Sequence, residues 1–288
     1  MKTCVSSYSF SRYVRESGAT QLQLISLAKE MGFDAIEFTD LCPPEGVDVL
    51  DYAKQLREEA EKLSMPIANY TIGADFLNAE DLDAEIERLY TRVDIAQALG
   101  ALGMRHDATG GYKGPEKKYK TFDDALPILA KGCRAVTEYA AAKGITTMVE
   151  NHGFFCQDST RVEKLVHAVG HENFGLLVDI GNFLCADDPS VTAVSRVANF
   201  ARHVHIKDFH IKSGSEPDPG NGWFRTRGGN YLRGAIVGHG NVPVMQCLSI
   251  LKRSEYDGFV SIEFEGIESN LDALSTGLEN LKRYIEMA

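Results

Sequence analysis

The segment RHVHIKD at residues 202–208 alternates apolar residues with side chains that can bind a metal ion, a proton or an anion. In an extended strand, the side chains at positions i and i+2 lie on the same face. The pattern therefore predicts a strand with His203, His205 and Lys207 on one face and apolar residues on the other. Such a polar face is either a wet surface or the lining of a functional interior, and the neighbouring strands decide between the two.

Short β-rich runs alternate along the whole chain with longer segments whose apolar residues recur at helical spacing. The predicted strands are Val5–Phe10, Asp34–Thr39, Ile67–Ile72, Met104–Ala108, Thr146–Asn151, Gly175–Ile180, Arg202–Asp208 and Phe259–Glu265. The predicted helices are Leu22–Met31, Val49–Leu63, Asp81–Leu99, Phe122–Lys143, Thr160–Val169, Val191–Phe200, Val244–Leu251 and Leu271–Met287. Strands that alternate with helices pair in parallel through right-handed crossovers.

Eight strand–helix units without a linker predict one α/β domain over residues 1–288, folded as a closed (β/α)₈ TIM barrel. The main alternative is an open doubly wound sheet, which usually carries a Gly-rich phosphate turn after its first strand. Residues 10–13 read FSRY and contain no glycine, so the barrel is favoured. The segment Ile211–Asn241 is too long for a simple connection and predicts a lid or binding loop. Near its end, the run GHGN at 238–241 resembles a Gly-x-Gly turn, which glycine's freedom at positive φ explains.

The composition excludes several classes of protein. Hydrophobic residues make up 44% of the chain and charged residues 25%, which is ordinary for a soluble globular protein. A net charge of −11 argues against nucleic-acid binding, which needs a basic surface, although a few basic groups are enough to hold one small phosphate. Six scattered cysteines, no apolar leader and no membrane-length apolar run predict a cytoplasmic protein without a membrane segment.

Metal-competent side chains collect at the ends of the last four predicted strands. In a barrel, catalytic groups lie at the C-terminal ends of strands and face inward. Taken alone, each carboxylate there is as well explained by capping a neighbouring loop. Together, so much buried negative charge is costly without a cation, so the set predicts one divalent metal site. Its oxygen-rich composition favours Mn²⁺, Mg²⁺ or Co²⁺, with Zn²⁺ as an alternative. The four residues are Glu150, Asp179, His205 and Glu263.

Five further residues are candidates for substrate contacts. His106 is either a substrate ligand or a hydrogen-bonded core histidine, and Glu37 binds either substrate or the amides at the barrel top. His152 lies one pleat above Glu150 and is placed to contact substrate. Lys207, one pleat above His205, either orients a substrate oxygen or pairs with a carboxylate of the metal set. Arg225, in the run WFRTR, is suited to clamping a carboxylate or phosphate, with a subunit contact as the alternative.

Four motifs carry a resemblance to a known family: VENH at 149–152, VDIGN at 178–182, HVHIKD at 203–208 and YDGFVSIE at 256–263. In this order they resemble the signatures of the sugar isomerase/epimerase superfamily with a xylose isomerase-like TIM barrel. That group includes ketose 3-epimerases, inosose isomerases and dehydratases, hydroxypyruvate isomerases and endonuclease IV. The resemblance spans nearly the whole chain. It implies that Glu150, Asp179, His205 and Glu263 ligate one divalent metal ion.

The resemblance also implies an enzyme of carbohydrate metabolism. Glu150 and Glu263 would be the acid/base pair of an isomerase or epimerase that moves a proton next to a carbonyl through a metal-stabilised enediolate. The substrate would be a small sugar, keto-polyol or sugar phosphate, and barrels of this kind often form homo-oligomers. The first alternative is a dehydratase of the inosose type, which uses the same metal site to eliminate a β-hydroxyl group.

Two positions depart from the pattern of the ketose 3-epimerases. Asn182 stands where those enzymes usually have a histidine, and Cys156 where they have a second glutamate. Both departures argue against a free-ketose epimerase. The residue at 182 and the acidic charge also argue against an endonuclease IV-like phosphodiesterase, which needs three zinc ions and a nucleic-acid partner. A barrel that keeps the metal and only binds a ligand is the last alternative.

Overall fold

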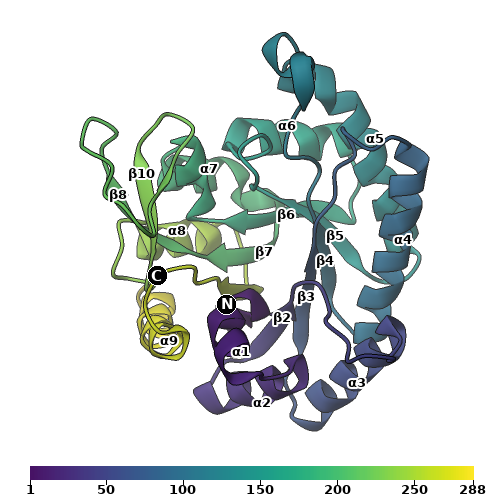
Figure 1. Cartoon of the computed structure of the whole chain (residues 1–288), viewed down its shortest axis with the longest axis vertical. Coiled ribbons are helices and arrows are strands. Elements are labelled where there is room, and N and C mark those ends of the chain that lie inside the picture. Colours follow the sequence, from purple (N-terminus) through teal and green to yellow (C-terminus); the bar gives the residue numbers. More distant parts are fainter.

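The eight strands of the barrel are parallel, and each pairs with the barrel strand that comes before it and the one that comes after it in the sequence. The barrel closes where its last strand pairs with its first. The computed structural model describes residues 1–288, and the strands run around the closed barrel in the order β1-β11-β7-β6-β5-β4-β3-β2. Figure 1 shows them in the middle of the molecule with the helices outside. They are β1 Lys2–Ser6, β2 Ala35–Phe38, β3 Ile67–Ile72, β4 Gly103–His106, β5 Thr146–Glu150, β6 Phe174–Asp179, β7 Ala201–Ile206 and β11 Phe259–Ile262. The predicted TIM barrel is confirmed.

The helices cover the outside of the barrel. They are α1 Ser11–Ser17, α2 Gln21–Met31, α3 Val49–Lys62, α4 Leu82–Leu99, α5 Phe122–Ala141, α6 Ser159–Val169, α7 Ser190–Val197, α8 Val244–Arg253 and α9 Asn270–Met287. All eight predicted helices are present, and α1 is an addition that the periodicity did not indicate. None of the nine is both long and apolar enough for a membrane span.

The first strand is shifted from its predicted position. It covers Lys2–Ser6, and the apolar and hydroxyl-rich residues after it form a 3₁₀ helix, Ser7–Phe10. The hydroxyl oxygen of Ser6 accepts a hydrogen bond from the backbone N–H of Tyr8 (3.4 Å), which caps this turn. Phe10 is fully buried, so this position is apolar because the side chain lies in the core and not because the residue belongs to a strand.

Strand β7 divides its side chains as the alternation predicts. Val204 and Ile206 are buried with the apolar core, whereas His203 and His205 bond the carboxylate of Glu37, which comes from β2 across the barrel. The interior of the barrel is therefore polar at the level of His203 and His205. Its apolar core lies mainly between the strands and the surrounding helices.

The long segment after β7 has regular structure that the sequence did not indicate. It forms an antiparallel sheet in the order β8-β10-β9, built from Asp208–Lys212, Tyr231–Ala235 and Phe224–Arg225. In Figure 1, β8 and β10 project from the barrel as a ribbon. Asp187, in the loop after β6, holds this sheet because its carboxylate accepts hydrogen bonds from the Thr226 hydroxyl and the Asn230 amide (both 2.8 Å).

Asp208 fixes the turn that leads from this sheet back to the barrel. Its carboxylate accepts hydrogen bonds from the backbone N–H groups of Gly238, Gly240 and Val242 (2.9, 2.9 and 3.0 Å). Gly238 has a φ of +90°, as predicted for this turn. Gly240 is required for a different reason, because a Cβ atom there would lie 2.2 Å from Asp208 Oδ1.

Candidate active site and metal centre

Four potential metal ligands meet at the C-terminal end of the barrel. Glu150, Asp179 and His205 end or nearly end β5, β6 and β7, and Glu263 directly follows β11. Their ligand atoms all lie within 4.8 Å of one another. Nδ1 of His205 is 3.6 Å from Glu150 Oε1, 3.6 Å from Glu263 Oε2 and 3.9 Å from Asp179 Oδ2. The structure thus brings together the four residues that the sequence selected.

Two buried atoms of this cluster lack hydrogen-bond partners, namely Asp179 Oδ2 and His205 Nδ1. The other carboxylate oxygen of Asp179 accepts hydrogen bonds from the backbone N–H groups of Gly181 and Asn182 (2.8 and 2.9 Å), which leaves Oδ2 for the cluster. Burial raises the pKa of Asp179 to about 6, against the attraction of Lys207. Because buried polar atoms are rarely unpaired, three carboxylates and one imidazole in this arrangement fit a divalent cation.

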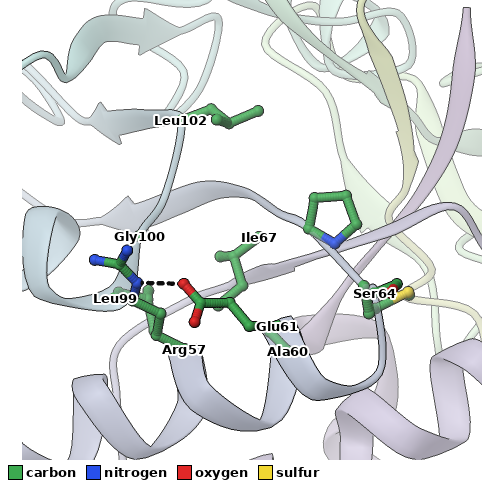
Figure 2. Close-up of a pocket in the computed structure, with 10 residues that line it drawn as sticks. Arg57, Ala60, Glu61, Ser64, Ile67, Leu99, Gly100 and Leu102 are labelled. Atoms are coloured by element: carbon green, nitrogen blue, oxygen red, sulfur yellow. Dashed lines mark hydrogen bonds and ion pairs between the residues drawn. The ribbon is translucent and has the colours of Figure 1, made fainter.

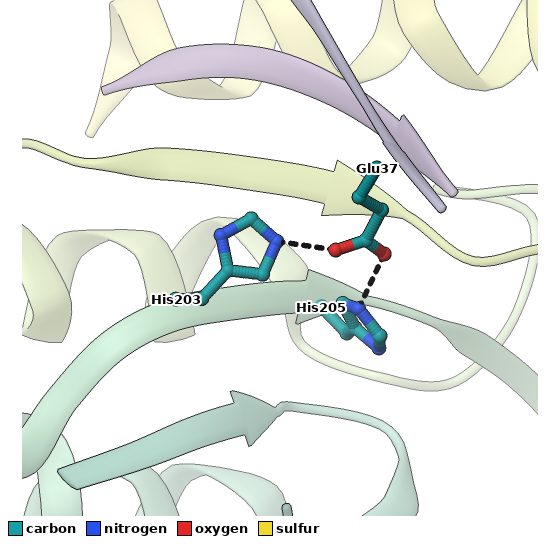
Figure 3. A group of neighbouring side chains, drawn as sticks. All are labelled: Glu37, His203 and His205. Atoms are coloured by element: carbon teal, nitrogen blue, oxygen red, sulfur yellow. Dashed lines mark hydrogen bonds and ion pairs between the residues drawn. The ribbon is translucent and has the colours of Figure 1, made fainter. Parts of the chain in front are cut away.

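Figure 3 shows Glu37 with its carboxylate directed at the rings of His203 and His205, and all three side chains are buried. Glu37 Oε1 is 2.6 Å from Nε2 of His205, and its Oε2 is 2.8 Å from Nε2 of His203. Burial disfavours the charged carboxylate, but the two histidines outweigh burial and lower the pKa of Glu37. With Nε2–H of His205 donated to Glu37, the ring presents Nδ1 to the metal ligands.

The position of Glu37 differs from both predicted roles. The side chain has no exposed surface, and it does not line the cavity of about 270 Å³ next to the metal-ligand candidates, so it does not contact a substrate there. Its partners are two imidazoles rather than backbone amides. The same group of Glu37, His203 and His205 could also be a second metal site, but 2.6 and 2.8 Å are hydrogen-bond distances that need no ion.

Arg105 is a site residue that the sequence reasoning missed. Its guanidinium group lies 2.7 Å from Glu150 Oε2 and 2.8 Å from Asp107 Oδ1, and it is almost fully buried. Burial opposes the charge on Arg105, yet Glu150 and Asp107 raise its pKa. Arg105 therefore holds one oxygen of a metal-ligand candidate, while the side-chain amide of Asn182 donates to the other oxygen (2.9 Å).

His106, which was predicted to contact substrate, lies on the opposite face of β4. Its ring packs edge-on against Phe76 at 5.7 Å, and its Nδ1–H donates to the backbone oxygen of Asp107 (2.8 Å). Burial lowers the pKa of His106 to about 4. The alternative of a hydrogen-bonded core histidine describes this position. A signal was available, because Met104 shares the face of His106 and its apolar side chain indicates the core.

A cavity of about 270 Å³ opens above the four metal-ligand candidates, two of which, Glu150 and Glu263, line it. Lys207 and His152 line it, as predicted, together with Arg105, Glu150 and Glu263. The ammonium group of Lys207 lies 2.5 Å from Glu263 Oε2 and 3.4 Å from Asp179 Oδ2. The remaining lining residues are Tyr8, Thr39, Asp40, Thr71, Ile72, Gly73 and Glu265.

Two of the basic groups in the cavity, Lys207 and His152, have pKa values raised by neighbouring carboxylates. Burial opposes the charge on Lys207, but Glu263 and Glu265 overcome it and raise the pKa of the ammonium group. Burial likewise opposes the charge on His152, and the hydrogen bond from its Nδ1 to Asp107 Oδ1 (3.0 Å) raises its pKa. The cavity therefore combines carboxylates with side chains that donate protons.

Arg225, the predicted anion clamp, does not line this cavity. Its guanidinium group packs over the ring of Tyr231 at 4.7 Å and donates to the Tyr231 hydroxyl (2.6 Å). Arg227, two residues later, reaches the barrel instead. It lies 2.8 Å from Asp158 Oδ2 and donates to the backbone oxygen of Phe154. The sheet contributes a contact to the barrel, but not through the residue that the sequence selected.

Another pocket, of about 360 Å³, lies at the opposite end of the barrel (Figure 2). It is bordered by the end of α3 and by the residues that lead into β3 and β4. Its charged side chains, Arg57 and Glu61, pair with each other at 2.7 Å, and no group of metal ligands is near. Because barrel enzymes work at the C-terminal ends of their strands, the candidate active site is the cavity of about 270 Å³ next to the four metal-ligand candidates.

The family model for xylose isomerase-like TIM barrels matches residues 25–284, which include all four metal-ligand candidates. The chain belongs to the xylose isomerase-like TIM barrel family. Among curated proteins, an inosose dehydratase from Clostridium perfringens (strain 13 / Type A) is 24% identical over 253 residues, covering 84% of this chain and 82% of that protein.

Solved structures share the fold of this xylose isomerase-like barrel. A probable 3-DHS dehydratase, AsbF, involved in petrobactin synthesis in Bacillus anthracis has a TM-score of 0.73 at 18% identity, covering 98% of this chain and 99% of that one. An L-ribulose 3-epimerase has a TM-score of 0.74 at 16% identity, covering 99% of this chain and 95% of that one. The relatives are thus enzymes, dehydratases and an epimerase among them, although identities this low show the fold alone.

Proposed function

We propose that this protein is a divalent-metal-dependent dehydratase that removes water from a small polyhydroxy ketone of the inosose type. One observation carries the proposal: a single cavity holds the carboxylates Glu150 and Glu263 together with His152, which can give a proton, and the hydrogen-bond donors Arg105 and Lys207. Elimination of water needs one group that removes a proton next to the carbonyl and another that protonates the departing hydroxyl group. The cavity offers both kinds of group.

Glu150, Asp179, His205 and Glu263 would hold the ion, for which Mn²⁺, Mg²⁺ or Co²⁺ is favoured. When bound, a divalent ion supplies Lewis-acid polarisation of the substrate carbonyl. Glu263 is the better placed base, because its side chain is 12% exposed against 3% for Glu150. Lys207 donates a hydrogen bond that orients a substrate oxygen.

The proton balance of the elimination closes with the residues of this cavity. Glu263 takes the proton from the carbon next to the carbonyl, and the electron pair of that C–H bond forms the new carbon–carbon double bond. The bond between the β-carbon and its hydroxyl oxygen breaks. His152 gives its proton to the departing hydroxyl group, which leaves as water. Exchange with solvent then restores the protons of both residues.

An isomerase or epimerase is the second candidate. Glu150 Oε1 and Glu263 Oε2 both lie 3.6 Å from His205 Nδ1, and proton transfer on both faces of a substrate would use such a pair. However, both oxygens of Glu150 already have partners, Arg105 at 2.7 Å and Asn182 at 2.9 Å. Glu263 has one close donor, Lys207 at 2.5 Å, and the more exposed side chain, so it rather than Glu150 is placed to take a proton from a substrate. A single placed base favours the dehydratase over a mechanism with two bases.

Product analysis in D₂O tests the proposal. The Mn²⁺-loaded protein is incubated with inososes, ketoses and hydroxy-keto acids, and products are followed by mass spectrometry, ultraviolet absorption and proton NMR. We expect a product lighter by one water molecule, with the absorption of a conjugated enone, and no product with Glu263→Gln. Chelator-treated protein is the control for dependence on the metal ion. The surface variant Glu61→Gln is the control for replacing a glutamate with glutamine.

The outcomes separate the candidates. A product of unchanged formula that carries deuterium next to the carbonyl would replace the dehydratase with an isomerase or epimerase. No metal-dependent turnover of any compound would leave a barrel that only binds its ligand.

A further inference from the structure

A second cavity, of about 340 Å³, adjoins the catalytic cavity. The two share four lining residues, Tyr8, His152, Lys207 and Glu265, so a ligand can extend from one into the other. We call the second cavity the outer compartment. Each cavity is close to the lower limit of about 300 Å³ for small-molecule sites, so together they exceed what one small ring requires.

Aromatic side chains and glycines form much of the outer compartment. Phe154, from the loop after β5, and Phe224, from β9, both line it. Gly153, Gly222 and Gly234 also line it. An open space between aromatic rings suits a flat ligand group with apolar faces.

Phe154 is held in a strained conformation that exposes its ring. Its φ of +65° lies in the left-handed region, which a bulky residue adopts only when the surroundings enforce it. Its N–H donates to Gln157 Oε1 (2.5 Å), and its carbonyl oxygen accepts from Arg227 of the projecting sheet. The buried amide of Gln157 donates in turn to the backbone oxygen of Asn182 (2.7 Å). The strained backbone does not bury the side chain in the core, because 46% of Phe154 remains exposed.

The charges around the outer compartment argue against a phosphate group there. Lys207 already faces Glu263 at 2.5 Å, and Glu265 lies 3.8 Å away as a further negative group. Among the arginines of the projecting sheet, Arg227 is paired with Asp158 at 2.8 Å. Arg233 lies 3.4 Å from Glu268, and Arg225 packs on Tyr231. The basic side chains that line the compartment itself, Lys207 and His152, both face carboxylates, Glu263 and Asp107, so an uncharged group is favoured there.

We propose that the substrate carries a second, uncharged ring, a glycosyl or aryl group, that lies in the outer compartment against Phe154 and Phe224. The reacting ketone ring then occupies the catalytic cavity. This inference rests on the proposed function, because it extends the same site. It makes the substrate a ring-substituted keto-polyol rather than a free monocyclic one or a phosphate ester.

Binding of unreactive analogues tests the inference without turnover. Isothermal titration calorimetry on the Mn²⁺-loaded protein compares inositol, glucosyl-inositol, an inositol phenyl ether and inositol monophosphate. We expect the better of the two ring-bearing ligands to bind at least roughly tenfold more tightly than inositol. Inositol monophosphate should show no such gain. The ligand with the larger gain identifies the ring as glycosyl or aryl.

Variants locate the source of this preference. Phe154→Ala and Phe224→Ala should each reduce the affinity ratio between the ring-bearing ligand and inositol to less than about threefold. Tyr119→Ala removes an aromatic side chain that is exposed but lines neither cavity, and it should leave the ratio unchanged.

Three results would overturn the inference: equal or weaker binding of both ring-bearing ligands, tightest binding of the phosphate, or a ratio that survives both phenylalanine substitutions. Absence of binding by all four ligands would overturn it as well. The proposed function fails on a different observation, the lack of metal-dependent water loss. A protein that dehydrates only unsubstituted inososes would therefore keep the function and lose this inference.

Discussion

The Oε1 atom of Glu37 lies 2.6 Å from Nε2 of His205, in a region of the barrel where neither side chain has exposed surface. This contact fixes both the rotation of the imidazole ring and the nitrogen that carries its proton. The other nitrogen, Nδ1, is left to face Glu150, Asp179 and Glu263. Glu37, which was expected to bind either substrate or the amides at the barrel top, instead orients one metal-ligand candidate through its outer hydrogen bond.

Replacing Glu37 with glutamine should weaken metal binding. The amide cannot accept from both His203 and His205, so the ring of His205 loses its fixed orientation. Loss of such an outer partner typically costs about 10- to 100-fold in metal affinity. Isothermal titration of the Glu37→Gln protein with Mn²⁺ measures the effect directly.

The exposed carboxylate Glu61, at the far end of the barrel, provides the matched control. Glu61→Gln should bind Mn²⁺ as the unmodified chain does, and circular dichroism should show that both variants are folded. If Glu37→Gln keeps the full metal affinity, the contact with His205 is a packing feature and does not prepare a ligand.

Much of the barrel could be predicted because its information is local. The period of apolar residues separates strands from helices, and glycines such as Gly32 and Gly100 end helices in the left-handed conformation. The metal cluster was equally accessible, since parallel strands in a barrel bring their C-terminal ends together. One chemically unusual residue at each of four strand ends was enough to select Asp179 and its partners.

What was not predicted depends on the choice of strand face and on long-range contacts. Adjacent residues of a strand lie on opposite faces, and His106 was selected in place of Arg105 because the apolar Met104 on the face of His106 was not used to choose between them. The projecting sheet forms because Asp187 and Asp208 bond residues some thirty to forty positions away. No local sequence pattern encodes such distant partners. The position of Glu37 likewise depends on its contacts with two histidines of β7, which are distant in the sequence.

Gly240→Ala should destabilise the protein. The added Cβ atom would lie 2.2 Å from Asp208 Oδ1, inside the set of hydrogen bonds that closes the turn before α8. Overpacking of this kind costs about 1–3 kcal/mol, which urea unfolding measures as a lower midpoint. Gly110→Ala is the control, since nothing lies within 4 Å of its added carbon and its φ is not positive. Equal midpoints for the two variants would show that the turn adapts without cost.

His106 should make stability depend on pH between 6.5 and 4. Burial lowers its pKa from 6.5 to about 4 in the folded chain, so the unfolded chain takes up the proton first as pH falls. The contribution of the neutral ring is therefore complete above pH 6.5 and is lost on acidification, by about 3 kcal/mol at pH 4. Unfolding free energies across this range should fall less steeply for His106→Gln. His239→Gln, at an exposed position, should follow the unmodified chain, and parallel curves for all three proteins would contradict the assignment.

Lys207→Met should separate catalysis from metal binding. The ammonium group lies 2.5 Å from Glu263 Oε2 and 3.4 Å from Asp179 Oδ2, so it competes with a cation for two of the ligands. Its removal should leave Mn²⁺ affinity equal or higher. Dehydratase turnover should nevertheless fall by about 100-fold or more, because the group that orients the substrate oxygen is gone. Lys212→Met, exposed on β8, should change neither quantity. If metal affinity and turnover fall together in Lys207→Met, the lysine supports the ligand cluster structurally and has no separate role toward the substrate.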